Sequence, residues 1–505
     1  MRIPHTISKN VFEAYRCSTE TISLPQEQGR KIRAEDDTWD ELIVPELKVL
    51  ALRKLVEGWQ KSSIFENLSS LDDRDMLLEM LPPDLPLEIV LKSIPYEYYW
   101  CRAAKDRWEN NNPAEHGNSW RRLYCERHFS EYLENLENLE SQRDECNALI
   151  KLCASLFFTL TIRSLVPSKY PYKWSEDDDE ATVRSEIFLT IHHSLNVILP
   201  QLPELREIYL NFGMIYLNDG FEWRDFKFSV EDCLNLGRGI KNSAKIQKVC
   251  ITRSSLDQPR VAALLQGVAV NNNIKELDLS HCKLADTGAH AVGEFLKYHR
   301  NLRHLYLTNN GIGSEGVAGI VHGLLQESAT PLQSLDLRLN PLRDKGGTHI
   351  CALLLRSSTL EKLNISACCL ETETGMGLAD VVSSDYMKIL SLNLDISNNN
   401  LGFIAGEALS SAIKMNTIIT QLDMRMCNFS KESEYLINQT IVRNREKNFK
   451  MQTKLEAIQS CPTIPMQVKS LIPPSKYKDL QKPHRNSIFF NESFKFITKG
   501  NGAEK

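Results

Sequence analysis

The sequence lacks the features that mark a membrane protein or a nucleic-acid-binding protein. Its 505 residues contain no run of eighteen apolar residues, and 60 Lys and Arg against 65 Asp and Glu leave a net charge of only −5. A membrane helix needs about twenty apolar residues, and a strong positive charge accompanies nucleic-acid binding. We therefore expect neither a membrane nor a nucleic acid as a partner. The most apolar stretch, residues 149–166, is interrupted by Lys151 and Arg163, so it predicts a buried helix.

Motifs that carry catalysis or hold cofactors are also absent. The 13 cysteines are scattered, without a CxxC pair or a Cys/His spacing suited to zinc. The N-terminal run MRIPHTISKN has no apolar core of a secretory signal, so reduced intracellular thiols are expected. A GxGxxG match at Gly311, Gly313 and Gly316 lies in phase with the repeat described next, and we interpret its glycines as serving a turn. We predict a protein that is not an enzyme, with no catalytic, cofactor-binding or metal-binding residues.

What the sequence does contain is an internal repeat. The pattern LxxLxLxx(N/C)xL appears as IKELDLSHCKL from Ile274, LRHLYLTNNGI from Leu302, LQSLDLRLNPL from Leu332 and LEKLNISACCL from Leu360. Degenerate copies begin at Leu205, Ile246, Ser391 and Ile419. From Ile246 onward, successive starts are separated by 28, 28, 30, 28, 31 and 28 residues. This regularity is typical of a stacked-repeat architecture.

Each repeat also has an amphipathic second half. Apolar residues recur four positions apart, for example Val292 and Leu296, and such a pair lies on one helix face. A single strand and helix cannot bury their apolar faces, but stacked units can. We predict an α/β leucine-rich-repeat solenoid of about eight units, with parallel strands on the concave side and helices outside. The repeat length resembles the ribonuclease-inhibitor type of leucine-rich repeat.

Two further positions of the repeat hold recurring residue types, Asn or Cys at one and Gly at the other. One phase, in the turn after the strand, should satisfy buried backbone groups with a polar or thiol side chain; it holds Cys282, Asn310, Asn340, Cys368, Asn399 and Cys427. Another phase holds Gly288, Gly316 and Gly346. We place these glycines just before the helix, where a tight backbone suits glycine.

The rest of the chain divides around the repeats. We expect a flexible N-terminus (1–30), a separate helical domain (31–140), a helical connector with an acidic linker at 175–181 (141–200), the repeats (201–445), and a polar helix with a basic extended tail (446–505). Residues 445–505 contain 12 Lys or Arg against 5 Asp or Glu, a charge of +7, which leaves −12 for the remainder. Such asymmetry predicts contact with an acidic surface, and the alternative is a solvated tail.

Two candidate partner-binding sites emerge. Aromatic residues are enriched at interfaces but also fill cores. If the aromatic residues serve an interface, the helical domain is a docking module, and deletion of residues 30–140 should leave a folded solenoid. The candidate interface residues of the helical domain are Tyr99, Trp100, Trp108 and Trp120. On the concave face, an acidic row would be formed by Asp278, Asp336, Asp395 and Asp423, interrupted by Tyr306 and Asn364 and flanked by Arg338 and Arg425. The row is either a docking surface for basic side chains or repeat consensus without a binding role.

The non-repeat motifs carry a more specific resemblance. They are RKIRAEDDTWDELIVPEL (30–47), PDLPLEIVLKSIPYEYYWCRAAKDRW (83–108), HGNSWRRLYCERHFSEYLENL (116–136) and ESEYLINQTIVRNRE (432–446). With the repeats between them, they resemble the family of T-complex-associated testis-expressed protein 1, also called dynein regulatory complex subunit 5, over about residues 30–447. The basic tail lies outside this resemblance.

The resemblance implies a subunit of the nexin–dynein regulatory complex, which links adjacent doublet microtubules and regulates dynein-driven sliding in motile cilia and flagella. It implies the other subunits of that complex as partners, and the axoneme as location. The alternative is a regulator of a small GTPase similar to Ran GTPase-activating proteins, which carry the same repeat class. The long segment before the repeats and the basic tail argue against that alternative.

Overall fold

The computed structural model describes most of the chain. The described residues are 46–59, 65, 68, 70–137, 139, 141–165, 192–211 and 229–459, of which the last nine are described as helix backbone. The chain divides into two compact units, Met1–Glu446 and Lys447–Lys505, and the architecture below is that of the first. The expected flexible N-terminus, the acidic linker and the basic tail after residue 459 lie outside the described residues.

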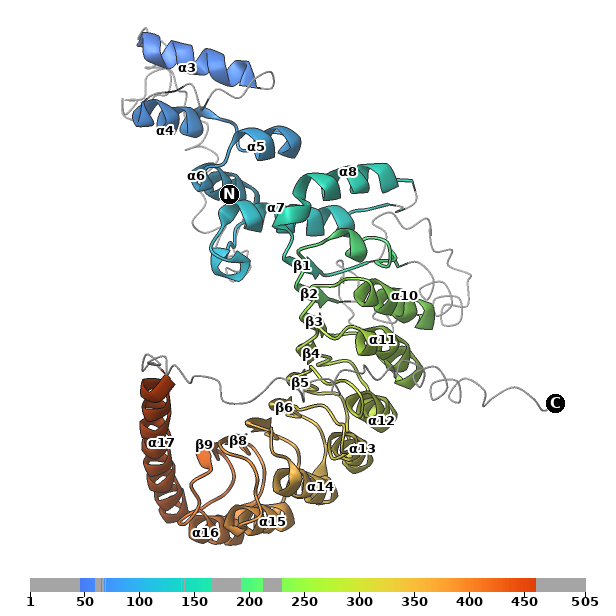
Figure 1. The fold of residues 1–505 in the computed structure, drawn as a ribbon, viewed down its shortest axis with the longest axis vertical. Helices are drawn as coiled ribbons and strands as arrows, with labels where there is room; N and C mark the ends of the chain where they lie inside the picture. The colour runs from blue at the N-terminus through green and yellow to red at the C-terminus, as the bar shows by residue number, and fades with distance from the viewer. Residues whose placement is uncertain are drawn as a thin grey trace, which may run out of the picture. The chain divides into compact units, whose positions relative to one another are not determined.

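Within the described residues, nine short strands form one parallel sheet in chain order (Figure 1). Each strand is hydrogen-bonded to the strands before and after it in sequence, as stacked repeats require. The strands are β1 (Thr159–Ile162), β2 (Glu207–Leu210), β3 (Lys248–Ile251), β4 (Glu276–Asp278), β5 (His304–Tyr306), β6 (Ser334–Asp336), β7 (Lys362–Asn364), β8 (Leu392–Asp395) and β9 (Ile419–Asp423).

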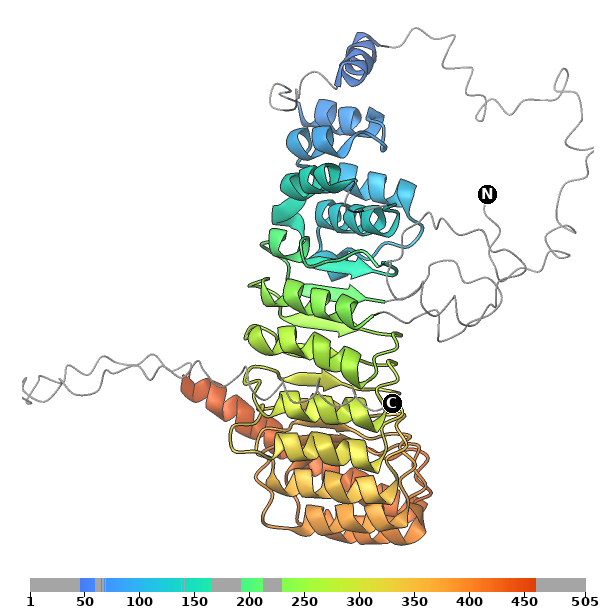
Figure 2. The same ribbon diagram turned by 90° about the vertical axis from the view of Figure 1, so that its right-hand side faces the viewer.

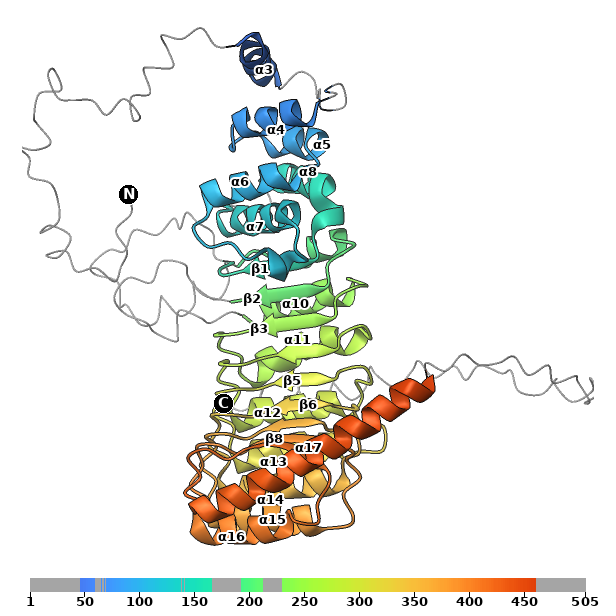
Figure 3. The same ribbon diagram turned by 90° about the vertical axis from the view of Figure 1, so that its left-hand side faces the viewer.

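A helix follows each strand from β2 onward. Figure 2 shows α10 to α16 stacked in a row, and Figure 3 shows the strand face on the opposite side. The helices are α10 (Val230–Lys241), α11 (Gln258–Val270), α12 (Ala285–Leu296), α13 (Ser314–Leu324), α14 (Arg343–Arg356), α15 (Thr372–Ser383), α16 (Gly402–Ala412) and α17 (Lys431–Gln459). The strands line the concave side and α10 to α16 the convex side, which confirms the predicted leucine-rich-repeat solenoid, whereas α17 lies beside β9.

Helices also dominate the segment before the sheet. They are α3 (Leu47–Glu57), α4 (Leu71–Met80), α5 (Leu87–Ser93), α6 (Glu97–Arg107), α7 (Trp120–Glu134) and α8 (Arg143–Cys153), with short 3-10 helices η5 (Pro113–His116) and η6 (Ala154–Leu156). A further 3-10 helix, η7 (Leu199–Gln201), lies between β1 and β2. Helices α5 and α6 are separated at Ile94, which takes an extended backbone before Pro95.

The sheet begins earlier than the sequence predicted. The apolar stretch 149–166 was expected to be one buried helix, but α8 ends at Cys153 and β1 follows at Thr159. In β1, Leu160 and Ile162 are buried while Thr161 between them is exposed, which is the two-residue alternation of a strand. β1 then pairs in parallel with β2 and becomes the first strand of the solenoid. The segment before residue 201 is therefore more than a helical connector.

The helical segment and the repeats share one hydrophobic core. A continuous cluster of buried side chains runs from Leu52 to Ile441. At the junction, the Phe129 ring of α7 stacks on the Phe157 ring, with the ring centroids 4.7 Å apart. The helical segment and the repeats therefore pack within one compact unit, with α7 directly on the first strand.

The turn residues satisfy the backbone as predicted. The Asn340 carboxamide oxygen accepts the N–H groups of Asn310 (2.8 Å) and Ile312 (3.1 Å), and its nitrogen donates to the Leu307 and Leu337 carbonyls. Asn399 bonds to the Cys368 and Leu370 N–H groups in the same way. The buried thiols donate instead to carbonyls of the preceding repeat, as Cys282 does to Ile251 at 3.1 Å. These contacts join one repeat to the next through otherwise unpaired groups.

The glycines that recur at one position of the repeat have a different role from the one predicted. Gly288, Gly316 and Gly346 lie inside the first turn of α12, α13 and α14, not before the helix. A Cβ atom on Gly316 would lie 2.5 Å from Asp286 Oδ1 and 3.0 Å from the Ala289 side chain. Close packing on the preceding repeat, rather than a tight turn, therefore requires glycine.

The last strand is covered by the start of α17. Ile437 and Ile441 on this helix are buried in the common core. The Asn444 carboxamide donates to the Asn416 carbonyl at 2.9 Å and the Ile419 carbonyl at 3.0 Å. These bonds satisfy backbone groups that a further repeat would otherwise pair, so this part of α17 caps the solenoid.

Candidate partner-binding surfaces

The predicted acidic row exists and extends across the sheet. Strand pairing places its members side by side, with Asp278 next to Tyr306 and Asp395 next to Asp423. In register order the full row is Thr161, Tyr209, Cys250, Asp278, Tyr306, Asp336, Asn364, Asp395 and Asp423. The first three were not predicted as site residues, because β1 has no repeat consensus and the copies around β2 and β3 are degenerate.

The acidic side chains of this row have a structural task. In each case a side-chain oxygen accepts the backbone N–H two residues later, which closes the turn after the strand. The distances are 2.9 Å for Asp278 to Ser280, 3.0 Å for Asp336 to Arg338, 3.0 Å for Asn364 to Ser366, 3.0 Å for Asp395 to Ser397 and 3.2 Å for Asp423 to Arg425. This repeated contact favours the consensus interpretation of the row.

Neighbouring cations also offset its charge. Arg425 forms an ion pair with Asp423, and its hydrogen bond lowers the pKa of that carboxyl group. Arg338 Nε lies 3.5 Å from Asp336 Oδ2. Burial raises the pKa of Asp336, whose residue is only 9% exposed. The surface presented to a partner is therefore a mixed one, formed by exposed Arg338 and Arg425 and half-buried Asp278, Tyr306, Asn364, Asp395 and Asp423.

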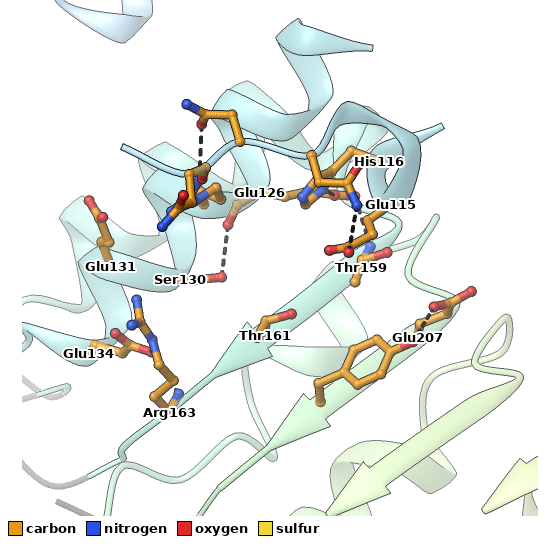
Figure 4. A pocket seen from close by; sticks show the side chains of 15 residues that line it. Glu115, His116, Glu126, Ser130, Glu131, Glu134, Thr159, Thr161, Arg163 and Glu207 are labelled. Carbon is orange, nitrogen blue, oxygen red and sulfur yellow. Dashed lines mark hydrogen bonds and ion pairs between the residues drawn. The ribbon is translucent and has the colours of Figure 1, made fainter. Parts of the chain in front are cut away.

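A cavity of about 1050 Å³ lies at the N-terminal end of the concave face. Figure 4 shows its walls: Glu126, Ser130 and Glu134 come from α7, and Thr159, Thr161 and Arg163 from β1 and its end. A smaller hollow of about 790 Å³ lies at the other end, between β8, β9 and the start of α17. The two hollows show that a partner could be held at either end of the strand face.

The two buried carboxylates of the larger cavity attach β1 to α7. Glu126 Oε1 accepts the backbone N–H groups of Phe158 and Thr159, both at 2.8 Å, and Arg122 Nε at 2.8 Å. Glu126 also pairs with His116. Glu134 Oε1 accepts the Arg163 N–H at 2.6 Å, and burial raises the pKa of Glu134. These carboxylates satisfy donors at both ends of β1, which is the edge strand of the sheet among the described residues.

The predicted aromatic anchors lie mostly in the core. Tyr99 and Trp100 are each 1% exposed and Trp108 is 8% exposed, whereas Trp120 is half-buried. The Trp100 indole donates to the Ile94 carbonyl at 3.0 Å, and the Tyr99 hydroxyl donates to the Pro82 carbonyl at 2.8 Å. Buried side chains that already have partners cannot serve as surface anchors, so the structure supports the core alternative for these three.

The expected result of deleting residues 30–140 changes accordingly. That deletion removes α7 and with it Glu126 and Glu134, which bind the N–H groups at both ends of β1. It also exposes the core side of Phe157. We therefore expect the solenoid to lose its fold at the N-terminal end after this deletion, because its first strand would lose its cap.

Two backbone N–H groups of the GxGxxG motif are already bound by a carboxylate. The helix α13 begins at Ser314, and a phosphate at its N-terminus would need backbone N–H donors there. Asp286 Oδ1 of the preceding repeat already accepts the N–H groups of Gly313 (2.6 Å) and Gly316 (2.9 Å). Asp344 plays the same part for α15, where it accepts the Glu371 and Thr374 N–H groups.

We accordingly expect no nucleotide at this motif. A bound phosphate would have to displace the Asp286 carboxylate and would meet its negative charge. Equilibrium dialysis of the full chain against ATP, GTP and NAD should show no saturable binding at micromolar concentration. Saturable binding that is lost when Gly313 is replaced by Ala would contradict this interpretation of the loop.

Other sites of chemistry are not apparent in the part of the chain that the structure describes. It contains no group of three metal-ligating side chains and no helix long and apolar enough to cross a membrane. Burial raises the pKa of Cys250 to about 12 and that of Cys427 to about 11. Since the thiolate is the reactive form of cysteine, these thiols are poor nucleophiles.

Comparisons with known proteins agree with the repeat and with the family that the sequence resembles. A family described as Leucine Rich repeat matches residues 270–293, 298–321 and 328–351. The chain is 31% identical over 269 residues to dynein regulatory complex subunit 5 of Mus musculus. The aligned region covers 52% of this chain and 54% of that protein. The chain is 30% identical over 269 residues to the Homo sapiens protein of the same name, with the same coverage of 52% and 54%.

An algal relative has the same name. The chain is 28% identical over 185 residues to dynein regulatory complex subunit 5 of Chlamydomonas reinhardtii, which covers 37% of this chain and 42% of that protein. The matched region spans about half the length of the mammalian relatives. The chain is therefore similar to dynein regulatory complex subunits over the part that aligns.

Proposed function

We propose that this chain is a non-catalytic scaffold subunit of the nexin–dynein regulatory complex. In this role it helps to link adjacent doublet microtubules and to regulate dynein-driven sliding in motile cilia and flagella. The observation that carries the proposal is the similarity to mammalian and algal proteins named dynein regulatory complex subunit 5. A repeat fold by itself would not suffice, because one fold hosts many functions.

The structure supports a binding role in place of catalysis. The short stacked strands form a wide face. Its carboxylates are fixed in position because they accept backbone N–H groups of the turns that follow the strands. Such rigid faces suit protein partners, since little conformational freedom is lost on binding. We assign the partner surface to the strand face around exposed Arg338 and Arg425 and half-buried Tyr306, and the partners to other subunits of the complex.

The proposal predicts where the chain resides. A tagged full-length chain in a ciliated cell should enter the cilium and remain with the axoneme after detergent removes the ciliary membrane. Retention is expected because a subunit of an inter-doublet link is bound to microtubule-associated proteins, not dissolved in the ciliary matrix. A chain that stays in the cell body, or leaves with the detergent-soluble fraction, would refute it.

The basic tail adds a second proposal, on residues that lie outside the described part of the chain. Residues 460–505 contain 8 Lys or Arg against 3 Asp or Glu, and this charge of +5 favours contact with the acidic surface of microtubules. Removal of residues 460–505 should reduce co-sedimentation with microtubules at low salt. The difference should shrink at physiological ionic strength, where exposed charges are screened over about 8 Å. Equal sedimentation of the two chains at low salt would exclude the microtubule contact.

A further inference from the structure

The larger cavity of the strand face has an acidic wall. Among the described residues, five glutamates line this cavity, against the two arginines Arg127 and Arg163. The glutamates are Glu115 from η5, Glu126, Glu131 and Glu134 from α7, and Glu207 from β2. Pockets for small molecules are lined mostly by apolar side chains. A wall of charged and amide side chains suits a segment of another protein better.

Two of these carboxylates are fully used in holding the fold. Glu126 Oε1 accepts the first N–H group of β1, and Glu126 Oε2 pairs with the His116 ring. Glu131 Oε2 accepts Arg107 at 2.7 Å, and Glu131 Oε1 accepts the Trp108 indole N–H. Both oxygens of each carboxylate therefore already have partners.

Glu115 and Glu207 are different, because each has an oxygen to spare. Glu115 Oε1 accepts the Asn112 amide at 2.8 Å, and Glu207 Oε2 accepts the Tyr209 hydroxyl at 2.8 Å. Neither glutamate forms an ion pair within the described residues. The second oxygen of each carboxylate has no donor there, and the two negative charges are not neutralised.

These two carboxylates border the same end of the cavity. Strand pairing places Glu207 next to Thr159, at the start of β1. Glu115 comes directly before His116, whose ring pairs with Glu126, and Glu126 accepts the Thr159 N–H. Figure 4 shows Glu115 and Glu207 on the side of the cavity where Thr159 lies.

Glu134, at the end of β1, is a buried carboxylate with a spare oxygen. The residue is only 6% exposed. Its Oε1 accepts the Arg163 N–H at 2.6 Å and lies 3.6 Å from Arg163 Nε, whereas Oε2 has no donor among the described residues. Burial raises the pKa of Glu134 despite the charge of Arg163, whose side chain is 66% exposed and is therefore screened by water. A further cation in the cavity would stabilise the ionised form of Glu134.

We propose that this cavity binds a basic segment of a partner protein. Lysine and arginine side chains have N–H donors and no acceptor, so they match carboxylate oxygens that lack a donor. One cationic side chain lies between Glu115 and Glu207, and another lies beside Glu134. The two ends of β1, which these carboxylates border, are about 13 Å apart. An extended segment of roughly five residues spans that distance.

The carboxylates are held in place before a partner binds. One oxygen of each is fixed by the Asn112 amide, the Tyr209 hydroxyl or the Arg163 N–H. Little conformational freedom is therefore lost on binding. The cavity lies at the opposite end of the sheet from Arg425, and its chemistry does not depend on the complex in which the chain works.

Binding of a labelled hexa-arginine peptide to the full-length chain tests the site. Fluorescence anisotropy at physiological ionic strength, where exposed charges are screened over about 8 Å, should show saturable binding. Glu207→Gln should weaken it about fivefold, and Glu115→Gln with Glu207→Gln about tenfold or more, because charge-assisted hydrogen bonds are lost. Glutamine keeps an acceptor for Asn112 and Tyr209, so the fold is retained. Glu373→Gln, at an exposed site on α15, makes the same change in net charge and should leave the affinity unchanged.

Arg163→Gln should act in the opposite direction. This variant removes the cation that competes for Glu134 but keeps the backbone N–H that Glu134 accepts. Binding of hexa-arginine should tighten about threefold, in keeping with the modest strength of an exposed ion pair. Arg356→Gln, at an exposed site on α14, is the matched control and should have no effect.

Three outcomes would overturn the proposal. The first is the absence of saturable binding of hexa-arginine below millimolar concentration. The second is equal weakening by Glu373→Gln and Glu207→Gln, which would show only a general attraction between the peptide and an acidic protein. The third is tighter binding after removal of residues 460–505, which would identify the chain's own basic segment as the occupant in place of a partner. Unchanged thermal melting of each variant establishes that a change in affinity reports on the cavity.

Discussion

Leu335→Asp should abolish cooperative folding of the repeat array. Leu335 is 1% exposed and lies at the centre of β6, next to Leu305 in β5 and Leu363 in β7. A carboxylate there would lose its hydration without gaining a partner, at a cost of several kcal/mol unless it takes up a proton. This loss is comparable with the whole stability of a typical domain, about 5–15 kcal/mol. Leu305→Asp should behave in the same way.

Thermal unfolding followed by circular dichroism measures the effect. The matched control is Lys362→Asp, which places the same charge on the exposed side of the adjacent strand β7. The control should shift the melting temperature by only a few degrees, since surface substitutions usually cost within about 0.5 kcal/mol. Wild-type melting of Leu335→Asp would show that the assigned phase of the repeat is wrong.

Glu126→Ala should destabilise the N-terminal end of the solenoid strongly. The Glu126 residue is 2% exposed, and its carboxylate binds two backbone N–H groups, Arg122 and His116. Its removal leaves the Arg122 guanidinium and both N–H groups without their acceptor. Breaking a buried ion pair on one side costs about 3–5 kcal/mol.

Hydrogen exchange locates this effect, while chemical denaturation measures it. The amides of Phe158 and Thr159 should lose protection first, because they donate to Glu126. Glu231→Ala removes the exposed ion pair with Arg238 on α10 and should cost less than about 1 kcal/mol. Unchanged protection of the β1 amides in Glu126→Ala would mean that α7 does not cap the sheet.

The parts of the fold that the sequence could predict are those governed by the repeat. From Ile274 to Leu360 the consensus is intact, and β4 to β7 lie where it places them. The Asn and Cys phase was equally predictable, because one buried turn recurs and needs the same hydrogen bonds each time. The convex helices followed from the four-residue spacing of apolar pairs such as Val292 and Leu296.

The parts that the sequence could not predict depend on contacts between distant segments. β1 was missed because its four residues, TLTI, sit within an apolar stretch that also fits a helix. Glu126 was missed because its partners Phe158 and Thr159 follow 32 and 33 residues later, and nothing in the local pattern of α7 reveals them. Composition likewise cannot distinguish a core Trp100 from an interface tryptophan, since both environments favour aromatic residues.

The candidate site was predicted in position but not in role. The sequence placed Asp278 and Asp395 in one row of the sheet, and strand pairing aligns them with Tyr306 and Asn364 in that row. It did not show that their carboxylates close turns, because that contact depends on the backbone geometry after the strand. The partner surface that we propose therefore rests more on Tyr306, Arg338 and Arg425 than on the aspartates.

Co-purification from axonemes tests the central proposal most directly. A tagged full-length chain, expressed in a ciliated cell and recovered from salt-extracted axonemes, should bring other dynein regulatory complex subunits with it, identified by mass spectrometry. A Tyr306→Ala, Arg338→Glu variant of the strand face should recover less of them, while Lys345→Glu on the convex helix α14 should recover as much as the wild type. Recovery of the wild-type chain from axonemes without any subunit of that complex would contradict the account.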